Sequence, residues 1–282
     1  MTRPLSVVVA SYGSEQFALL DRIVRQCGHT PVAYVLSRSM RPATPSEEEF
    51  ITSLSEIVKA IPNGMDLLLP GRAIGLEKQL SGYAPDLMVV LGFNWRIPAE
   101  VLALPRLGIL NIHPSILPRY RGPSPVPWAI RNGDQHFGLT VHRMNDDMDS
   151  GPVMSRSDLI PIPDRPTHEE IWNRIASALP NVLTESIRLA IAGANGEPQE
   201  SELATYASLP TAEWFVIDLA DSRVRIYHQI RAIDFLRPGE GVVVEAGNRR
   251  IRVRQASLAE IPGGLAVPCA DGTLWLADWE YA

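Results

Sequence analysis

The sequence of 282 residues is poor in cysteine, basic side chains and long apolar runs, and each shortage excludes a class of protein. Its two cysteines, Cys27 and Cys269, stand far apart. This spacing fits neither a metal site nor a disulfide framework, so no metal and a reducing, cytoplasmic location are expected. No apolar run reaches the roughly 20 residues that a membrane helix needs, so no membrane partner is expected. Residues 5–10 are too short for a signal peptide and are expected to form a strand.

The charge balance is acidic, with 26 Lys and Arg against 32 Asp and Glu and a net charge of −6. Proteins whose main partner is a nucleic acid usually carry a basic surface, because neutralising phosphates dominates their affinity. The acidic average therefore makes a large RNA substrate less favoured, although a local basic patch is not excluded by it.

The first two thirds of the chain alternate between buried strands and amphipathic helices. Continuous apolar runs predict strands at residues 5–10, 31–36, 66–69, 86–91 and 107–113, and partly alternating ones predict strands at 138–144 and 153–160. Helical spacing predicts helices at 15–27, 51–61, 75–82, 98–104, 126–132 and 167–192, the last interrupted near Pro180. This βαβ pattern predicts an α/β fold, a Rossmann-like, mostly parallel sheet with helices on both faces.

The composition changes after residue 192, because residues 193–204 are mostly small or polar, which is typical of a linker. Beyond it the sequence predicts one helix at 220–233 and short β segments at 241–245, 249–257, 264–268 and 273–277. We therefore expect a catalytic domain over residues 1–203 and a small, mostly antiparallel β domain over 204–282.

Three polar residues form a plausible acyl-transfer set. Asn111 and His113 lie two apart at the end of a predicted strand, so their side chains share one face, beyond which ligands of open α/β sheets bind. Asp149 follows in a polar loop. An amide can hold a carbonyl oxygen that gains charge, an imidazole can move a proton or bond that oxygen, and a carboxylate can orient the imidazole. Taken alone, Asn-x-His is equally compatible with a core hydrogen bond, and Asp-Ser-Gly with a turn.

A longer pattern resolves this choice. The run from Asn111 to Gly122, with a second run from Met144 to Gly151, resembles the folate-dependent formyltransferase family, which includes methionyl-tRNA, glycinamide ribonucleotide and amino-sugar N-formyltransferases. Residues 13–18, 83–104 and 226–232 extend the resemblance over most of the chain.

The resemblance implies a catalytic trio of Asn111, His113 and Asp149, and N10-formyltetrahydrofolate as a consumed cosubstrate. The amine would attack the formyl carbon directly and give a tetrahedral intermediate. Asn111 and His113 would stabilise its oxygen, and Asp149 would assist proton removal. The folate would be held by the residues Phe93, Asn94, Trp95, Arg96, Ile97, Asn145, Asp146 and Asp147. The acceptor would be held by Tyr12, Gly13, Ser115, Arg119 and Arg121.

The sequence departs from the tRNA-formylating members of the family, which carry a basic insertion after the second strand. The matching region, residues 37–56, contains Arg38 and Arg41 but also Glu47, Glu48, Glu49 and Glu56. An acidic cluster repels phosphate, although these glutamates could simply belong to the first turn and exposed face of a helix. From residue 204 onward 8 Arg stand against 10 Asp and Glu. Arg250, Arg252 and Arg254 are expected on one solvated strand face.

We therefore expect a small-molecule amine acceptor, such as an amino sugar or a specialised metabolite, ahead of methionyl-tRNA. A formyltetrahydrofolate hydrolase and a catalytically inactive binding homologue are further alternatives. The hydrolase would release formate without an acceptor, and an inactive homologue would have no chemical reason to keep the whole trio. The oligomeric state stays open, with a homodimer as one option.

Overall fold

The computed structural model describes residues 3–37, 48–93, 96–247 and 249–282, which divide into two compact units. The first unit combines Met1–Arg121, Leu139–Asp158 and Ala176–Ala204, and the second combines Gly122–Gly138, Leu159–Ile175 and Thr205–Ala282. Within the described ranges, no helix is long and apolar enough to cross a membrane.

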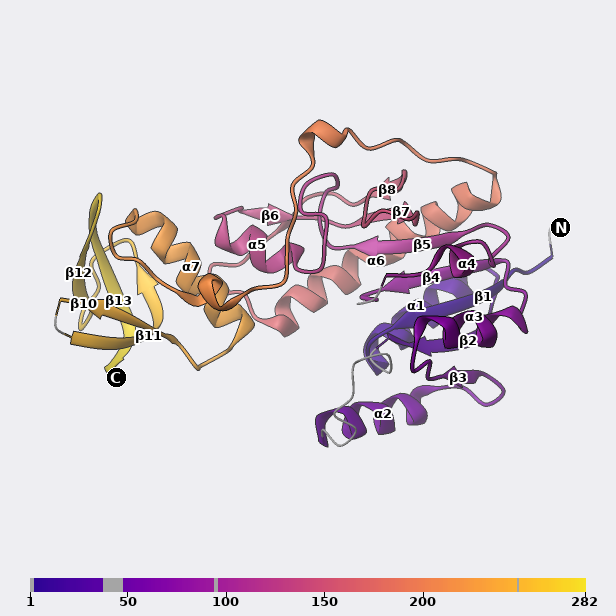
Figure 1. Ribbon diagram of the computed structural model, residues 1–282, viewed down its shortest axis with the longest axis horizontal. Coiled ribbons are helices and arrows are strands. Elements are labelled where there is room, and N and C mark those ends of the chain that lie inside the picture. The colour runs from indigo at the N-terminus through magenta and orange to yellow at the C-terminus, as the bar shows by residue number, and fades with distance from the viewer. Residues whose placement is uncertain (1–2, 38–47, 94–95, 248) are drawn as a thin grey trace. The chain divides into compact units, whose positions relative to one another are not determined.

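The first unit is built on a seven-stranded sheet with the order β3-β2-β1-β4-β5-β7-β8 (Figure 1). Its strands are β1 (Ser6–Ser11), β2 (Thr30–Leu36), β3 (Asp66–Leu68), β4 (Leu87–Leu91), β5 (Ile109–His113), β7 (Thr140–Arg143) and β8 (Val153–Arg156). The strands from β3 to β5 in that order are parallel, whereas β7 and β8 are each antiparallel to the preceding strand. The chain adds β2 and β3 on one side of β1 and then β4 and β5 on its other side, as in doubly wound folds. The sheet therefore confirms the predicted Rossmann-like α/β class.

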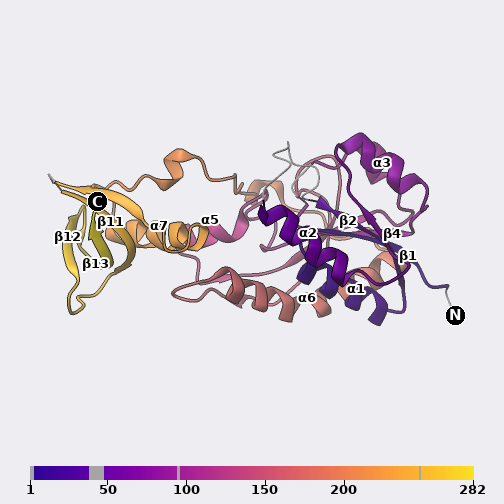
Figure 2. The same cartoon turned by 90° about the horizontal axis from the view of Figure 1, so that it is seen from below.

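Helices cover both faces of this sheet, and alternating strand residues pack against each layer. The helices are α1 (Ser14–Gln26), α2 (Glu48–Ala60), α3 (Ala73–Ser81), α4 (Ala99–Leu102) and the part of α6 (His168–Ile191) that starts at Ala176. Figure 2 shows α3 on one face and α1 and α6 on the other. Leu76 and Leu80 of α3 pack in one cluster with Val8. On the opposite face the Phe17 ring of α1 lies 4.6 Å from the Tyr34 ring, centroid to centroid.

Helix α6 is continuous for 24 residues, and the predicted interruption near Pro180 is wrong. A proline inside a helix removes one N–H donor and crowds the preceding turn, which costs about 3 kcal/mol. Here the flanking turns bury Leu179, Leu183 and Ile187 almost completely. Burial of that apolar stripe is large enough to offset the local loss.

The second unit contains the predicted antiparallel sheet, with the order β10-β11-β13-β12 (Figure 1). Its strands are β10 (Val242–Ala246), β11 (Arg249–Ser257), β12 (Leu265–Cys269) and β13 (Gly272–Tyr281), which the helix α7 (Arg223–Leu236) packs against. The unit also contains α5 (Pro125–Arg131), the short strands β6 (His136–Phe137) and β9 (Ile160–Pro161), and the 3-10 helix Ala212–Phe215. The two-residue strands β6 and β9 are too short to produce a period in the sequence.

The division into domains 1–203 and 204–282 stays a prediction with a direct test. The change between the two units at Ala204 falls inside the polar stretch 193–204, but residues 122–138 and 159–175 also belong to the second unit. We expect limited proteolysis to cut first between residues 192 and 206, because exposed polar connections are the preferred sites of nicking. A larger N-terminal and a smaller C-terminal fragment should appear together. First cuts elsewhere would contradict the division.

Candidate active site

Two neighbouring strands bring the polar residues of the site together. Asn111 and His113 are on β5, which lies antiparallel to β7 in a register that pairs Asn111 with His142 and His113 with Thr140. In an antiparallel pair, directly opposite residues have side chains on the same face and within about 5.5 Å at Cβ. The register therefore places two histidines and one asparagine side by side at the end of β5.

The imidazole of His113 is fixed in one tautomer by the loop that follows β5. Its side chain is buried, and its Nε2–H donates to the carbonyl oxygen of Tyr120 over 2.7 Å. A carbonyl can only accept, so Nε2 carries the proton and Nδ1 is the atom that can gain or lose one. Nδ1 lies 3.6 Å from Oδ2 of Asp149. Burial lowers the pKa of His113 below 6.5, while the carboxylate of Asp149 opposes that shift.

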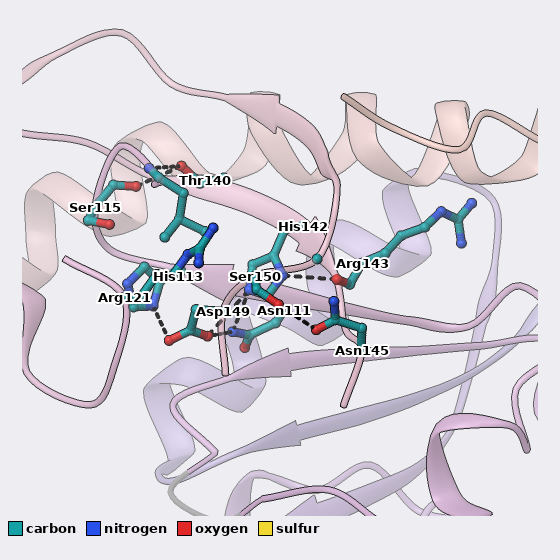
Figure 3. Close-up of polar contacts among 12 residues, drawn as sticks. Asn111, His113, Ser115, Arg121, Thr140, His142, Arg143, Asn145, Asp149 and Ser150 are labelled. Atoms are coloured by element: carbon teal, nitrogen blue, oxygen red, sulfur yellow. Dashed lines mark hydrogen bonds and ion pairs between the residues drawn. The ribbon is translucent and has the colours of Figure 1, made fainter. Parts of the chain in front are cut away.

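The amide of Asn111 is held by two acceptors. Its Nδ2 lies 3.1 Å from Nε2 of His142 and 3.3 Å from Oδ1 of Asp149. His142 is 1% exposed, and its Nδ1–H donates over 3.0 Å to the carbonyl oxygen of Arg143, which leaves Nε2 as an acceptor. Asn111 therefore points its N–H groups, and not its carbonyl, at Asp149 and His142. Figure 3 shows the carboxylate of Asp149 between the side chains of His113 and Asn111.

The loop that carries Asp149 has little conformational freedom. Asp149 adopts φ +51°, in the left-handed region that few residues other than glycine occupy. At Gly151 a Cβ atom would overlap with the carbonyl oxygen of Arg143, so only glycine fits there. Ser150 donates its hydroxyl to Oδ1 of Asn145 and closes the loop on itself (Figure 3).

The predicted acceptor residues after β5 make hydrogen bonds within their own loop and its surroundings. Ser115 is buried and donates to the carbonyl oxygen of Arg119, while Thr140 donates to the carbonyl oxygen of Ser115. Arg119 donates to the hydroxyl of Tyr120, and Arg121 donates to Oε1 of Gln199. The hydroxyl of Ser115 thus serves the fold of the loop, and the acceptor-binding roles of these three residues stay predictions.

The predicted acceptor residues before α1 lie at the end of β1. The backbone carbonyl of Gly13 accepts a hydrogen bond from the hydroxyl of Tyr34. The ring of Tyr12 lies against Gly92, where a Cβ atom would overlap with it. Gly92 has φ +70°, so both its backbone and its close contact require glycine.

The predicted folate residues are distributed between the core and the surface. Ile97 is buried in the apolar cluster beside α3 and α4, and Phe93 is partly buried against the same cluster. Arg96 is exposed, as are the residues Asn145, Asp146 and Asp147 of the loop before Asp149. Asn94 and Trp95 lie outside the described residues. The folate-binding roles that the resemblance implies for these residues stay predictions.

Two residues that contact the site were missing from the sequence-based set. His142 reads as an ordinary strand residue, and only the β5–β7 register reveals that it faces Asn111. Gln199 lies in the apparent linker, where composition alone gives no signal for a contact with residue 149. Across the described part of the chain, no group of three or more His, Cys, Asp or Glu is placed to hold a metal ion.

A doubly wound sheet with an amide, an imidazole and a carboxylate at a strand end is chemically suited to an enzyme that transfers a group at a carbonyl carbon. Comparison with known proteins narrows this class. The model of the formyl transferase family matches residues 6–187. Methionyl-tRNA formyltransferase from Roseiflexus sp. (strain RS-1) is 32% identical, over 95% of this chain and 83% of its own length. The enzyme of that name from Pseudomonas fluorescens (strain Pf0-1) is 31% identical, over 98% of this chain and 88% of its own.

Among solved structures, an N-formyltransferase from Helicobacter canadensis, crystallised with folinic acid and dTDP-3-aminofucose, shares the fold. Its TM-score is 0.69 at 17% identity, over 98% of this chain and all of the other. The chain belongs to the formyl transferase family, which confirms the membership that the motif residues predicted. It is a folate-dependent formyltransferase.

Proposed function

We propose that this enzyme moves the formyl group of N10-formyltetrahydrofolate to a primary amine of a small molecule, such as an amino sugar or a specialised metabolite. The observation that carries the chemistry is the contact of Asp149 with both His113 and Asn111 at the end of β5. Nothing in this arrangement requires a covalent enzyme intermediate, because the amine itself can serve as the nucleophile.

In the proposed reaction the nitrogen of the acceptor amine attacks the formyl carbon and the bond from that carbon to N10 of the folate breaks. The amine loses one proton and N10 gains one. The resemblance implies that His113 stabilises the oxygen and that Asp149 assists proton removal, whereas this proposal gives the proton to His113. Nδ1 of His113 is suited to carry it, because burial keeps the imidazole neutral and Nε2 is already committed to Tyr120. The carboxylate of Asp149, 3.6 Å away, stabilises the imidazolium that forms. Nδ2 of Asn111 donates to the carbonyl oxygen as it becomes negative.

In the proposed complex the folate lies at the edge of the sheet where β4 and β5 end. The partly buried ring of Phe93 can cover an aromatic surface, and the exposed loop at residues 145–147 adjoins Asp149. Membership of the formyl transferase family, shown by the family model and by the relatives, supports a formylated folate as the donor here.

The preference for a small acceptor rests on charge. Arg252 and Arg254 of β11 pair with Glu280 of β13, and Arg254 also pairs with Asp278. Exposed ion pairs are weak, at about 0–1 kcal/mol each, and phosphates could compete for them. The neighbouring carboxylates nevertheless reduce the positive field that attracts an RNA backbone. Glu48 and Glu49 form the start of α2, whereas Arg38, Arg41 and Glu47 lie outside the described residues.

Methionyl-tRNA is the second candidate acceptor, and the relatives favour it. The two related enzymes from Roseiflexus and Pseudomonas carry that name, and the matches cover nearly all of this chain. The structural neighbour from Helicobacter canadensis was instead solved with a nucleotide-linked amino sugar, and at 17% identity it supports the fold alone.

A direct comparison of acceptors tests the proposal. The full-length enzyme is supplied with N10-formyltetrahydrofolate and, in parallel, with a panel of nucleotide-linked amino sugars and other small amines or with charged initiator methionyl-tRNA. We expect at least one small amine to be formylated with a kcat/KM well above that of methionyl-tRNA at physiological salt. Efficient formylation of methionyl-tRNA under these conditions would overturn the small-acceptor proposal and leave the chemistry intact.

A further inference from the structure

Gln199 reaches the loop of Asp149 from the segment that follows α6. Its Nε2 donates to two backbone carbonyl oxygens, that of Asp149 over 2.8 Å and that of Gly151 over 2.7 Å. Its Oε1 accepts from Nε and Nη2 of Arg121 over 3.1 and 2.9 Å. All four residues belong to the first unit.

This hydrogen-bonding pattern allows only one orientation of the Gln199 amide. Carbonyl oxygens can only accept and a guanidinium group can only donate, so a flipped amide would lose every bond. Both amide hydrogens and the amide oxygen are therefore committed. A residue bound in this way on all sides acts as a fixed spacer between Arg121 and the loop at residues 149–151.

The backbone conformation of the loop at residues 149–151 has to be held by contacts of this kind. Asp149 has a left-handed backbone conformation, which persists only where the surroundings impose it. Its carboxylate lies within 3.6 Å of Nδ1 of His113 and 3.3 Å of Nδ2 of Asn111. A rotation of the Asp149 backbone would move the carboxylate away from both partners.

The segment that carries Gln199 is itself anchored to the sheet. The backbone of Glu197 exchanges two hydrogen bonds of 2.8 Å with Val153, at the start of β8. The carboxylate of Glu197 also pairs with Arg156 of β8 over 2.6 Å. The backbone two residues before Gln199 is thus fixed to the sheet. Gln199 can therefore restrain the loop at residues 149–151, because its own position does not depend on that loop.

We propose that Gln199 is a positioning residue for the formyl-transfer reaction, one that holds Asp149 in register with His113 and Asn111 through the backbone of the loop. The inference rests on the proposed catalytic role of Asp149. It assigns a function to a residue in the polar stretch 193–204, outside the motif residues of the family resemblance.

The sharpest test is Gln199→Glu. This variant has nearly the same shape and still accepts from Arg121, but it loses both donors and sets an oxygen against two carbonyl oxygens. We expect kcat to fall about 10- to 100-fold, the scale of a misplaced catalytic group, while the KM values for folate donor and amine change less than about threefold. The neighbouring, exposed Glu200 supplies the matched control, and Glu200→Gln should keep the wild-type kcat.

A double-substitution cycle separates positioning from general stability. If Gln199 acts through Asp149, then Gln199→Glu should add almost no further loss of kcat in an Asp149→Asn background. Additive losses, or a Gln199→Glu enzyme with wild-type kcat, would overturn the positioning role. Should Gln199→Glu not fold, Gln199→Ala removes the same donors without adding a charge and gives the same comparison. If Asp149→Asn alone keeps full activity, the proposed reaction mechanism fails, which is a distinguishable result.

Discussion

Replacing His113 by alanine is expected to lower kcat by roughly 10²-fold or more, the usual scale for a positioned proton-transfer group. Nδ1 is the only ring atom of His113 available for the amine proton, because Nε2 is held by the carbonyl of Tyr120. Asp149→Ala should have an effect of similar size, since it removes the carboxylate that stabilises the charged imidazole. The affinity for the folate should change much less, because its contacts are assigned to other loops.

The measurement is steady-state formylation at saturating donor and acceptor, with the dissociation constant of the folate determined separately. His136, an exposed residue of β6, provides a control, and His136→Ala should keep the wild-type kcat. In the wild type the low pKa of His113 keeps the base neutral as the pH falls past 6.5, so kcat/KM should decline only below that value. A His113→Ala enzyme with a kcat within tenfold of wild type would refute the role of His113.

Asn111→Ala should reduce kcat by about 10²- to 10³-fold through the loss of a donor to the developing oxyanion. The amide is oriented before the substrate arrives, since His142 and Asp149 both face its Nδ2. The bond to Asp149 is the longer of the two, so this N–H is the one that can turn to the substrate oxygen at the least cost.

Asn111→Asp is the companion to this experiment, because it keeps the size of the side chain, removes both N–H donors and sets a second carboxylate against Asp149. Rapid-mix, single-turnover measurements would isolate the chemical step from product release. We expect the loss of kcat for Asn111→Asp to be at least that for Asn111→Ala, with a nearly unchanged folate affinity for both variants. A loss that appears only in the KM of the amine would instead assign Asn111 to acceptor binding.

The sequence was sufficient for most of the regular elements because their signals are local. Continuous apolar runs identify β1 and β4, since strands buried on both faces lack polar alternation. The spacing of Asn111 and His113 likewise follows from the two-residue period of a strand. The position of Asp149 close to both depends on the return of β7 beside β5, which no local pattern predicts. The family resemblance implied the trio but not this pairing of strands.

Contacts between distant segments were beyond such reasoning. Pro180 lacks a backbone N–H donor, which predicts a break in the helix. The packing of the surrounding turns of α6 nevertheless keeps the helix continuous. His142 and Gln199 are ordinary residues of a strand and of a polar connection until tertiary contacts bring them to Asn111 and to the loop of Asp149. At Ser115 the motif position predicts a ligand contact, and only the fold shows that its hydroxyl also donates to the loop backbone.

The fate of the formyl carbon tests the central claim most directly. The enzyme is given N10-formyltetrahydrofolate labelled with ¹³C in the formyl group, together with the best amine from the acceptor panel and charged initiator methionyl-tRNA, and the products are followed by NMR and mass spectrometry. The account predicts that the label appears in a formamide of that small amine, in equal amount to the tetrahydrofolate released, and that the Asp149→Asn enzyme loses this product. Label that accumulates as free formate, or that enters only methionyl-tRNA, would contradict it.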